Sequence, residues 1–141
     1  MGEGEPAMIL GMGTDLSEIG RIKKSIDRFG DRFLERVYTP DEIAYCMTKK
    51  GFAESFAARF AAKEAAAKAV GTGISRGVSW KEFEVTRAVS GKPSMVLHGR
   101  AAELAKELGV TRISLSLTHS RETALAVVAM EGPDGFEARE D

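Results

Sequence analysis

A carboxylate beside a glycine-rich stretch is one feature of this sequence that could support chemistry. Asp15 follows Gly11 and Gly13, which come directly after the short apolar segment 8–10. The stretch is not a dinucleotide-binding fingerprint, because Leu16 stands where the third glycine would be, and the chain has no Gly-Lys-Ser/Thr phosphate loop. Two interpretations stay open: Asp15 caps the following helix, or it faces a ligand that the glycines allow to come close.

A second group of charged residues lies on the alanine-rich helix that we predict over residues 53–70. On a helical wheel Lys63 falls inside the apolar face, while Glu64 and Lys68 lie at its edge. One interpretation is an exposed Glu64–Lys68 pair at i, i+4, worth about 0.3–0.5 kcal/mol. We favour a functional site, because burying a lone carboxylate or ammonium costs several kcal/mol and these charges interrupt an otherwise apolar face.

Two carboxylates and a lysine fit one kind of chemistry. Mg²⁺ is held in proteins by oxygen ligands, commonly one or two carboxylates together with phosphate oxygens and water. Asp15 and Glu64 alone would leave positions open for a pyrophosphate, and a metal there would offset the charge that develops on the departing phosphate. The pattern therefore favours Mg²⁺-assisted chemistry on a phosphate compound.

His119 is a further candidate, at the end of a predicted strand over 113–118. It stands beside Ser120 at the mouth of a turn, where the two side chains could hold a phosphate. A lone histidine in such a place is more often structural than catalytic. The chain holds 2 histidines and 1 cysteine, Cys46, which argues against a typical zinc site and excludes an internal disulfide.

The hydrophobic pattern predicts the scaffold that must position these residues. The segment 39–42 (Thr-Pro-Asp-Glu) is a typical capped helix start, and Gly71-Thr72-Gly73 ends the long helix. Gly11 and Gly13 are expected to end the first strand. The order of elements predicts an α+β fold with an antiparallel sheet. The predicted strands are 8–10, 83–89, 95–97, 113–118 and 123–130, and the predicted helices are 17–29 with 32–36, 40–47, 53–70 and 100–108.

Length and charge set the class of protein. The 141 residues favour one domain over 8–131, with flexible tails at 1–7 and 132–141, the second of them acidic. The net charge is −1, but residues 8–130 hold 19 basic and 14 acidic side chains, which suits an anionic ligand or acidic partner rather than nucleic acid. We expect a soluble cytoplasmic protein, because we find no signal peptide, no apolar run of about 20 residues and only one cysteine.

A series of short motifs resembles that of the bacterial holo-acyl-carrier-protein synthases. The motifs stand in that family's order and at its spacings, and the resemblance covers about residues 8–131. The alanine-rich block with a downstream Ser-x-Thr-His is the most specific part. The matching motifs are Gly11-Met-Gly-Thr-Asp15, Arg59-Phe-Ala-Ala-Lys-Glu-Ala65 with Lys68, Gly71-Thr-Gly73, Gly91-Lys-Pro93 and Ser116-Leu-Thr-His119.

The resemblance implies a fold of the 4′-phosphopantetheinyl transferase type, with an antiparallel sheet and a long central helix. It implies transfer of 4′-phosphopantetheine from coenzyme A to a serine of apo-acyl carrier protein, for fatty acid biosynthesis, with 3′,5′-ADP as the second product. Mg²⁺ would be bound by Asp15 and Glu64, Glu64 would be the base, and Lys68 would lie beside the transferred phosphate. The residues that it implies for coenzyme A binding are Arg59, Lys68, Gly71, Gly91, Lys92, Pro93, His119 and Ser120.

The resemblance also implies partners. Acyl carrier protein would dock on the face of Arg21, Arg28 and Arg32, whose charge would attract an acidic surface. A homotrimer is implied, with an active site that spans two chains, and the small hydroxyl residues that alternate along 113–118 suit a face packed against another subunit. We expect neither nucleic acid nor membrane as a partner. The alternatives are a non-catalytic coenzyme A- or nucleotide-binding module, which would need no metal pair, and a purely structural trimer.

Overall fold

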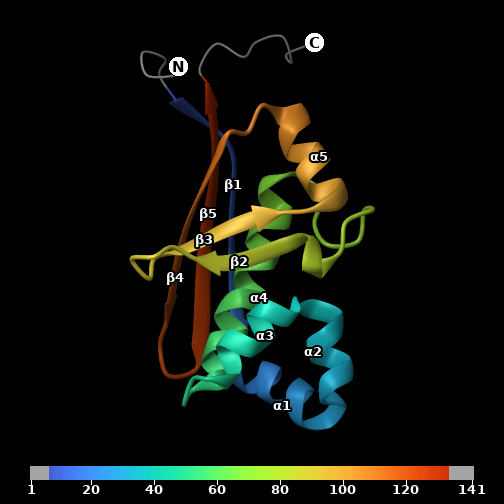
Figure 1. Cartoon of the computed structure of the whole chain (residues 1–141), viewed down its shortest axis with the longest axis vertical. Coiled ribbons are helices and arrows are strands. Elements are labelled where there is room, and N and C mark those ends of the chain that lie inside the picture. Colours follow the sequence, from blue (N-terminus) through green and yellow to red (C-terminus); the bar gives the residue numbers. More distant parts are fainter. Residues whose placement is uncertain (1–6, 134–141) are drawn as a thin grey trace.

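The computed structural model describes residues 7–133, so the expected tails lie outside this range except at their inner ends (Figure 1). The prediction of an α+β fold with antiparallel strands is confirmed. The last strand continues two residues beyond the expected domain. The strands are β1 Ala7–Glu18, β2 Phe83–Arg87, β3 Pro93–Leu97, β4 Arg112–His119 and β5 Thr123–Pro133. The helices are α1 Ile19–Phe29, α2 Asp31–Val37, α3 Pro40–Met47, α4 Phe52–Ala69 and α5 Gly99–Leu108, with a 3₁₀ turn over Trp80–Glu82.

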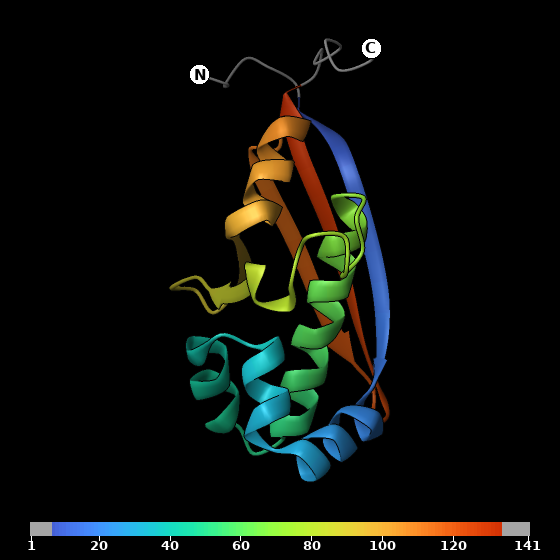
Figure 2. The ribbon, with the colours of Figure 1, turned by 90° about the vertical axis from the view of Figure 1, so that its right-hand side faces the viewer.

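Helix α4 lies between two β layers. The antiparallel sheet in the order β1-β5-β4 covers one side of the helix, and the β2–β3 hairpin lies on the other side (Figure 2). Alternate residues of β5 point at the helix, and Ala126, Val128 and Met130 among them are fully buried. Within residues 7–133 no helix covers the opposite face of the sheet, where Met12 and Leu16 are exposed (Figure 2).

Gly11 and Gly13 do not end the first strand, contrary to our prediction. Strand β1 runs through both residues to Glu18. A Cβ atom on Gly13 would lie 1.8 Å from the carbonyl oxygen of Ala65, and one on Gly11 would lie 2.2 Å from that of Ala69. The glycines therefore let β1 approach the α4 backbone more closely than any side chain would allow.

A buried ion pair fastens α4 to α3 and to the hairpin. Lys63, which was predicted to lie inside the apolar face, is fully buried and donates to Glu42 Oε1 at 2.7 Å and to the Phe83 carbonyl at 2.7 Å. The second oxygen of Glu42 accepts the Val85 N–H at 2.7 Å. The pair thus satisfies polar backbone groups of β2 that would otherwise be buried without partners.

The helices at the other end of the molecule follow their local signals. Thr39 caps α3 as predicted, because its hydroxyl accepts the Glu42 N–H while the Glu42 carboxylate accepts the Thr39 N–H. Gly30, with a φ of 55°, separates α1 from α2. Arg21 and Arg28 therefore lie on α1 and Arg32 on α2, all of them exposed. The predicted arginine face is divided between two helices.

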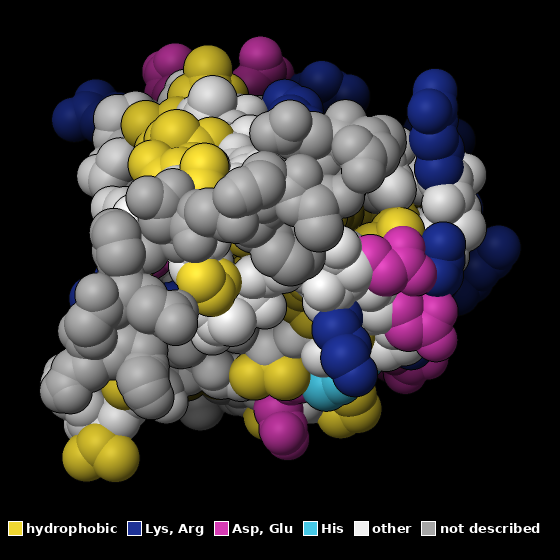
Figure 3. Space-filling view, turned by 90° about the horizontal axis from the view of Figure 1, so that it is seen from above, with side chains coloured by type: hydrophobic (Ala, Val, Ile, Leu, Met, Phe, Trp, Pro, Cys, Tyr) yellow, Lys and Arg dark blue, Asp and Glu magenta, His cyan; other side chains and the backbone are white. Residues whose placement is uncertain are grey.

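Helix α5 carries a mixed and solvated charge pattern. Arg100 pairs with Glu103 at 3.0 Å and with Glu107 at 3.6 Å, and all three side chains are about half exposed or more. Seen from above, acidic and basic side chains lie together on this end of the molecule (Figure 3).

None of the helices in the described part of the chain is long and apolar enough to cross a membrane.

Candidate active site

Helix α4 is buried on almost every side, and one stripe is the exception. From Phe56 onwards, only Phe60, Glu64 and Lys68 of this helix are not buried. Their spacing of four residues places them on one face. Phe60 stacks on Trp80 with ring centroids 4.6 Å apart. The stripe therefore presents Glu64 and Lys68 at the edge of the apolar face, as their positions in the sequence predict.

Asp15 lies on β1 against this stripe. Its Oδ1 atom accepts a 2.9 Å hydrogen bond from Lys68 Nζ, which also donates to the Thr14 carbonyl at 3.0 Å. The two structural alternatives that the sequence left open are not observed. Helix α1 begins after Glu18 and has no side-chain cap in the described part of the chain, and Lys68 forms its ion pair with Asp15 instead of with Glu64.

Asp15 and Glu64 line the same cleft, which has a volume of about 520 Å³. Burial raises the pKa of Glu64 above its ordinary value, the negative charge of Asp15 raises it further, and the charge of Lys68 lowers it. The charge of Asp15 thus acts on Glu64 at the cleft that both side chains line. Arg21 of α1 also lines the cleft, and Phe33 and Phe60 form part of its apolar wall.

The acidic groups in this cleft suit a hard cation. Among residues 7–133 no group of three or more His, Cys, Asp and Glu side chains is arranged to hold a metal. Two carboxylates are a typical contribution to a Mg²⁺ site, where substrate phosphates and water supply the other ligands. Asp15 and Glu64 therefore fit Mg²⁺ together with a phosphate compound.

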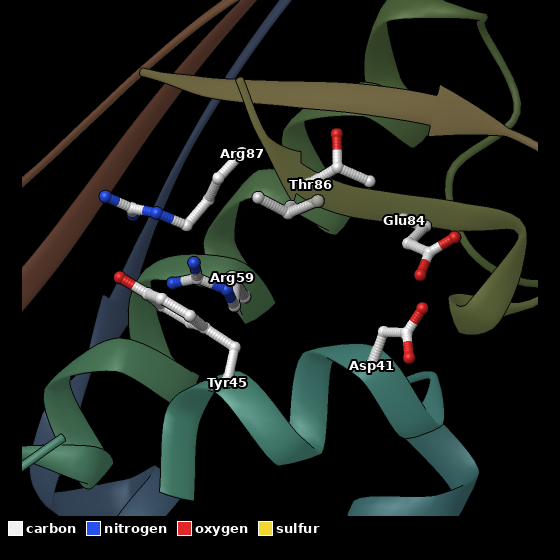
Figure 4. Close-up of a pocket in the computed structure, with 7 residues that line it drawn as sticks. Asp41, Tyr45, Arg59, Glu84, Thr86 and Arg87 are labelled. Atoms are coloured by element: carbon white, nitrogen blue, oxygen red, sulfur yellow. The ribbon is translucent and has the colours of Figure 1, made fainter. Parts of the chain in front are cut away.

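A second pocket of about 220 Å³ lies between α3, α4 and β2 (Figure 4). Arg59 and Arg87 lie over the ring of Tyr45, with their guanidinium carbons 4.6 and 4.7 Å from its centroid, and Lys49 Nζ lies 4.8 Å from the same centroid. Arg59 is 5% exposed, and its buried Nε atom has no hydrogen-bond partner among the described residues. Arg59 and Arg87, with Lys49 near the same ring, favour an anionic group on the arginine side of the pocket, opposite the acidic Asp41 and Glu84 of its lining.

The sequence pointed to Arg59 but not to the rest of this pocket. Lys49 stands beside a second lysine just before α4, which was a weak local signal for an anion site. Nothing in the sequence pattern pairs Tyr45 of α3 with Arg87 of β2 across Arg59. Figure 4 shows the two arginines together on one side of the pocket, with the acidic Glu84 on the other.

The remaining predicted coenzyme A residues line neither of the two pockets, although Ser120 Oγ accepts the N–H of Thr123, which lines the cleft, at 3.3 Å. His119 and Ser120 are exposed at the end of β4, and the sheet register places His119 two strands away from Ser17 of β1. The segment Gly91-Lys92-Pro93 lies at the tip of the β2–β3 hairpin, where Lys92 and Pro93 line a groove next to β4. Gly71, with a φ of 92°, follows the end of α4.

Sequence comparison identifies related proteins. The chain matches the family model described as the 4′-phosphopantetheinyl transferase superfamily over residues 11–128. The holo-[acyl-carrier-protein] synthase of Koribacter versatilis is 56% identical over 124 residues, which make up 88% of this chain and 99% of that protein. The corresponding protein of Solibacter usitatus is 52% identical over the same shares of the two chains.

Solved structures of holo-[acyl-carrier-protein] synthases have the same fold as this chain. The holo-[acyl-carrier-protein] synthase of Neisseria meningitidis has a TM-score of 0.78 and 39% identity, covering 87% of this chain and 98% of that one. The Helicobacter pylori protein, solved in complex with coenzyme A, has a TM-score of 0.75 and 33% identity, covering 84% and 98%. On the family match, the identities and the shared fold, the chain belongs to the holo-[acyl-carrier-protein] synthases of the 4′-phosphopantetheinyl transferase superfamily.

Proposed function

We propose that this chain transfers the 4′-phosphopantetheine group from coenzyme A to a serine of apo-acyl carrier protein, giving holo-acyl carrier protein and 3′,5′-ADP for fatty acid biosynthesis. The observation that carries the proposal is that Asp15 from β1 and Glu64 from α4 line one cleft, with Lys68 of α4 paired to Asp15 beside it. Relatives named for this activity share 56% and 52% of their residues with the chain over nearly their whole length.

Asp15 and Glu64 would hold Mg²⁺ together with the pyrophosphate of coenzyme A. Bound there, the ion supplies positive charge that stabilises the negative charge growing on the departing nucleotide. The raised pKa of Glu64 supports this assignment, since the neighbouring Asp15 contributes to it and a divalent cation would relieve that repulsion.

Glu64 would also take the proton from the attacking serine of the carrier protein. A serine hydroxyl is a weak nucleophile near neutral pH and needs a base within about 3 Å, directly or through water. Burial raises the pKa of Glu64, which brings it closer to the working range of a general base. Lys68 would donate to the phosphate oxygens and stabilise their charge in the transition state, and its contact with Asp15 already places it beside the cleft.

The pocket around Arg59 would hold an anionic group of the coenzyme A nucleotide. The Nε of Arg59, which has no hydrogen-bond partner within residues 7–133, and the three cations around Tyr45 support this part of the proposal. The structures of the Helicobacter pylori and Bacillus anthracis proteins contain coenzyme A or 3′,5′-ADP. The coenzyme A contacts that we still predict from the family resemblance are those of Gly71, Gly91, Lys92, Pro93, His119 and Ser120.

A homotrimer with shared active sites would bring these separate residues together. The sheet face away from α4 carries exposed apolar residues on β1, where Met12 and Leu16 are 56% and 65% exposed. Exposed apolar surface of this kind favours a subunit interface, and small side chains allow close packing. In such a trimer His119 of one chain would complete the cleft of its neighbour. The small residues that β4 adds to the same face are Ser114, Ser116 and Thr118.

Acyl carrier protein would reach the cleft across α1. Arg21 lines the cleft itself, while Arg28 and Arg32 are exposed beyond it. An acidic partner bound on these arginines would bring its serine towards Glu64. The cytoplasm is the compartment in which we place the reaction, as the sequence predicts.

Transfer to the carrier protein separates this function from that of a non-catalytic coenzyme A-binding module. The chain, Mg²⁺, coenzyme A and apo-carrier protein would be combined, and mass spectrometry would follow the carrier protein. We expect the wild type to add phosphopantetheine, and Asp15→Ala and Glu64→Ala each to lower the rate at least about 10²-fold while circular dichroism shows an unchanged fold. No mass gain with the wild type, or near-normal activity of either variant at saturating Mg²⁺, would refute the proposal.

A further inference from the structure

Lys68 makes a contact that the proposed reaction does not require. Its ammonium donates to Asp15 Oδ1 at 2.9 Å and to the Thr14 carbonyl at 3.0 Å, so both acceptors belong to β1. Glu64 lies one helical turn away on the same stripe of α4. The Lys68 side chain is 51% exposed, whereas that of Asp15 is only 19% exposed. The ammonium of Lys68, at the end of a long and half-exposed side chain, is therefore bonded to the carboxylate that is proposed to bind the metal.

The Lys68 ammonium and a metal ion would compete for Asp15. The three side chains Asp15, Glu64 and Lys68 carry a formal charge of −1 together, and −2 without the lysine, so removing Lys68 should strengthen the attraction for a divalent cation. A bound pyrophosphate would remove this competition for Asp15. Its oxygens offer Lys68 other charged acceptors, and its negative charge attracts both the ammonium and the metal ion.

We propose that Lys68 couples the binding of Mg²⁺ to the binding of coenzyme A, because it occupies Asp15 until the pyrophosphate draws it away. The inference rests on the proposed function, since it takes Asp15 and Glu64 as the metal ligands. It means that the metal alone binds weakly, and that metal and coenzyme A strengthen each other's binding by the same factor. Lys68 would thus limit occupation of the site by cations that arrive without substrate.

The affinity for Mn²⁺ tests this coupling directly. Mn²⁺ shares the preference of Mg²⁺ for oxygen ligands, and its free concentration can be followed by electron paramagnetic resonance, with protein-free mixtures of Mn²⁺ and coenzyme A as the reference. Without coenzyme A, we expect Lys68→Met to bind Mn²⁺ about two- to fivefold more tightly than the wild type, as for the loss of one partly exposed ion pair. With saturating coenzyme A, the order should reverse.

A matched control removes a different paired lysine. Lys23 pairs with Asp27 at 3.2 Å on α1 and does not line the cleft, so Lys23→Met should leave Mn²⁺ binding unchanged in both conditions. Lys68→Gln serves as a second variant that also lacks the charge. If both Lys68 variants bind Mn²⁺ no more tightly than the wild type without coenzyme A, or equally more tightly with and without it, the coupling is refuted.

A further variant distinguishes failure of the coupling from failure of the metal assignment. Asp15→Asn should weaken Mn²⁺ binding strongly if Asp15 is a ligand. Full Mn²⁺ affinity in this variant would refute the proposed site itself. Loss of affinity in Asp15→Asn, combined with wild-type behaviour of the Lys68 variants, would leave the proposed function standing and reject only the coupling.

Discussion

The buried pair of Lys63 and Glu42 offers a quantitative test of how α3, α4 and β2 are held together. Both side chains are 0% exposed, and the ammonium and carboxylate lie 2.7 Å apart. The substitution Glu42→Gln keeps the size of the side chain but removes its charge. The Lys63 ammonium is then left buried with only backbone carbonyls as partners. The amide of the new side chain has a single accepting oxygen, so it cannot accept from both Lys63 and the Val85 N–H as the two carboxylate oxygens do.

The expected cost of Glu42→Gln is about 3–5 kcal/mol of unfolding free energy, the range found when one partner of a buried ion pair is removed. For a chain of this length this corresponds to a melting temperature lower by roughly 6–20 °C. Asp27→Asn is the matched control, because the Lys23–Asp27 pair has the same chemistry with side chains 56% and 61% exposed. The control should cost only about 0.3–0.5 kcal/mol.

The stability difference between Glu42→Gln and the wild type should depend on pH. Burial lowers the pKa of Lys63 below its ordinary value, and the charge of Glu42 partly offsets this, so the Glu42→Gln variant should lower that pKa further. Between the folded and unfolded pKa values the unfolded chain binds more protons, so stability rises with pH. The deficit of the variant relative to the wild type should therefore shrink from pH 7 towards pH 10, as measured by urea unfolding at equal protein concentrations. A deficit that grows with pH, or one no larger than that of Asp27→Asn, would refute the reasoning.

Three further predictions concern the strand that carries Asp15, the docking helix and the subunit interface. Gly13→Ala should lower the unfolding free energy by about 1–3 kcal/mol or more and reduce transfer, because its Cβ would collide with α4. Gly20→Ala, whose Cβ would meet no described residue within 4 Å, should be neutral or stabilising. Arg28→Glu, outside the cleft, should raise the KM for carrier protein roughly fivefold or more with little effect on the KM for coenzyme A, and the wild-type KM for carrier protein should rise with salt; equal effects on both substrates would contradict docking there. Asp15→Ala and His119→Ala subunits, refolded together, should regain a fraction of wild-type activity if clefts are shared, and a mixed population that stays inactive, or a monomer by light scattering, would count against the shared site.

Features that depend on neighbouring residues were predictable from the sequence. The Thr39–Glu42 capping box forms as expected, and Gly109 ends α5 in the left-handed conformation that glycine favours. The alternation along 113–118 gave the orientation of β4, with Leu115 buried and its neighbours exposed. In each case the interaction that decides the structure lies within a few residues of the chain.

Contacts between distant segments were not predictable in the same way. The wheel position of Lys63 indicated that it is buried, but its partner Glu42 lies on another helix, 21 residues away. Asp15 and Lys68 are 53 residues apart, so the helical wheel offered Glu64 as the nearer partner and the structure shows Asp15 instead. A charged residue near an apolar face indicates that it needs a partner, but the fold decides which residue is that partner.

The interface of β1 with α4 accounts for the position of the candidate site. Gly11, Gly13 and Asp15 follow one another at every second residue, so they share a face of the strand. The two glycines bring that face against the backbone of Ala69 and Ala65, and the long side chain of Lys68, which lies between those two residues in α4, reaches Asp15. Glycines at a period of two are thus a signal of close approach rather than of a strand end, and a carboxylate in phase with them is directed at the helix.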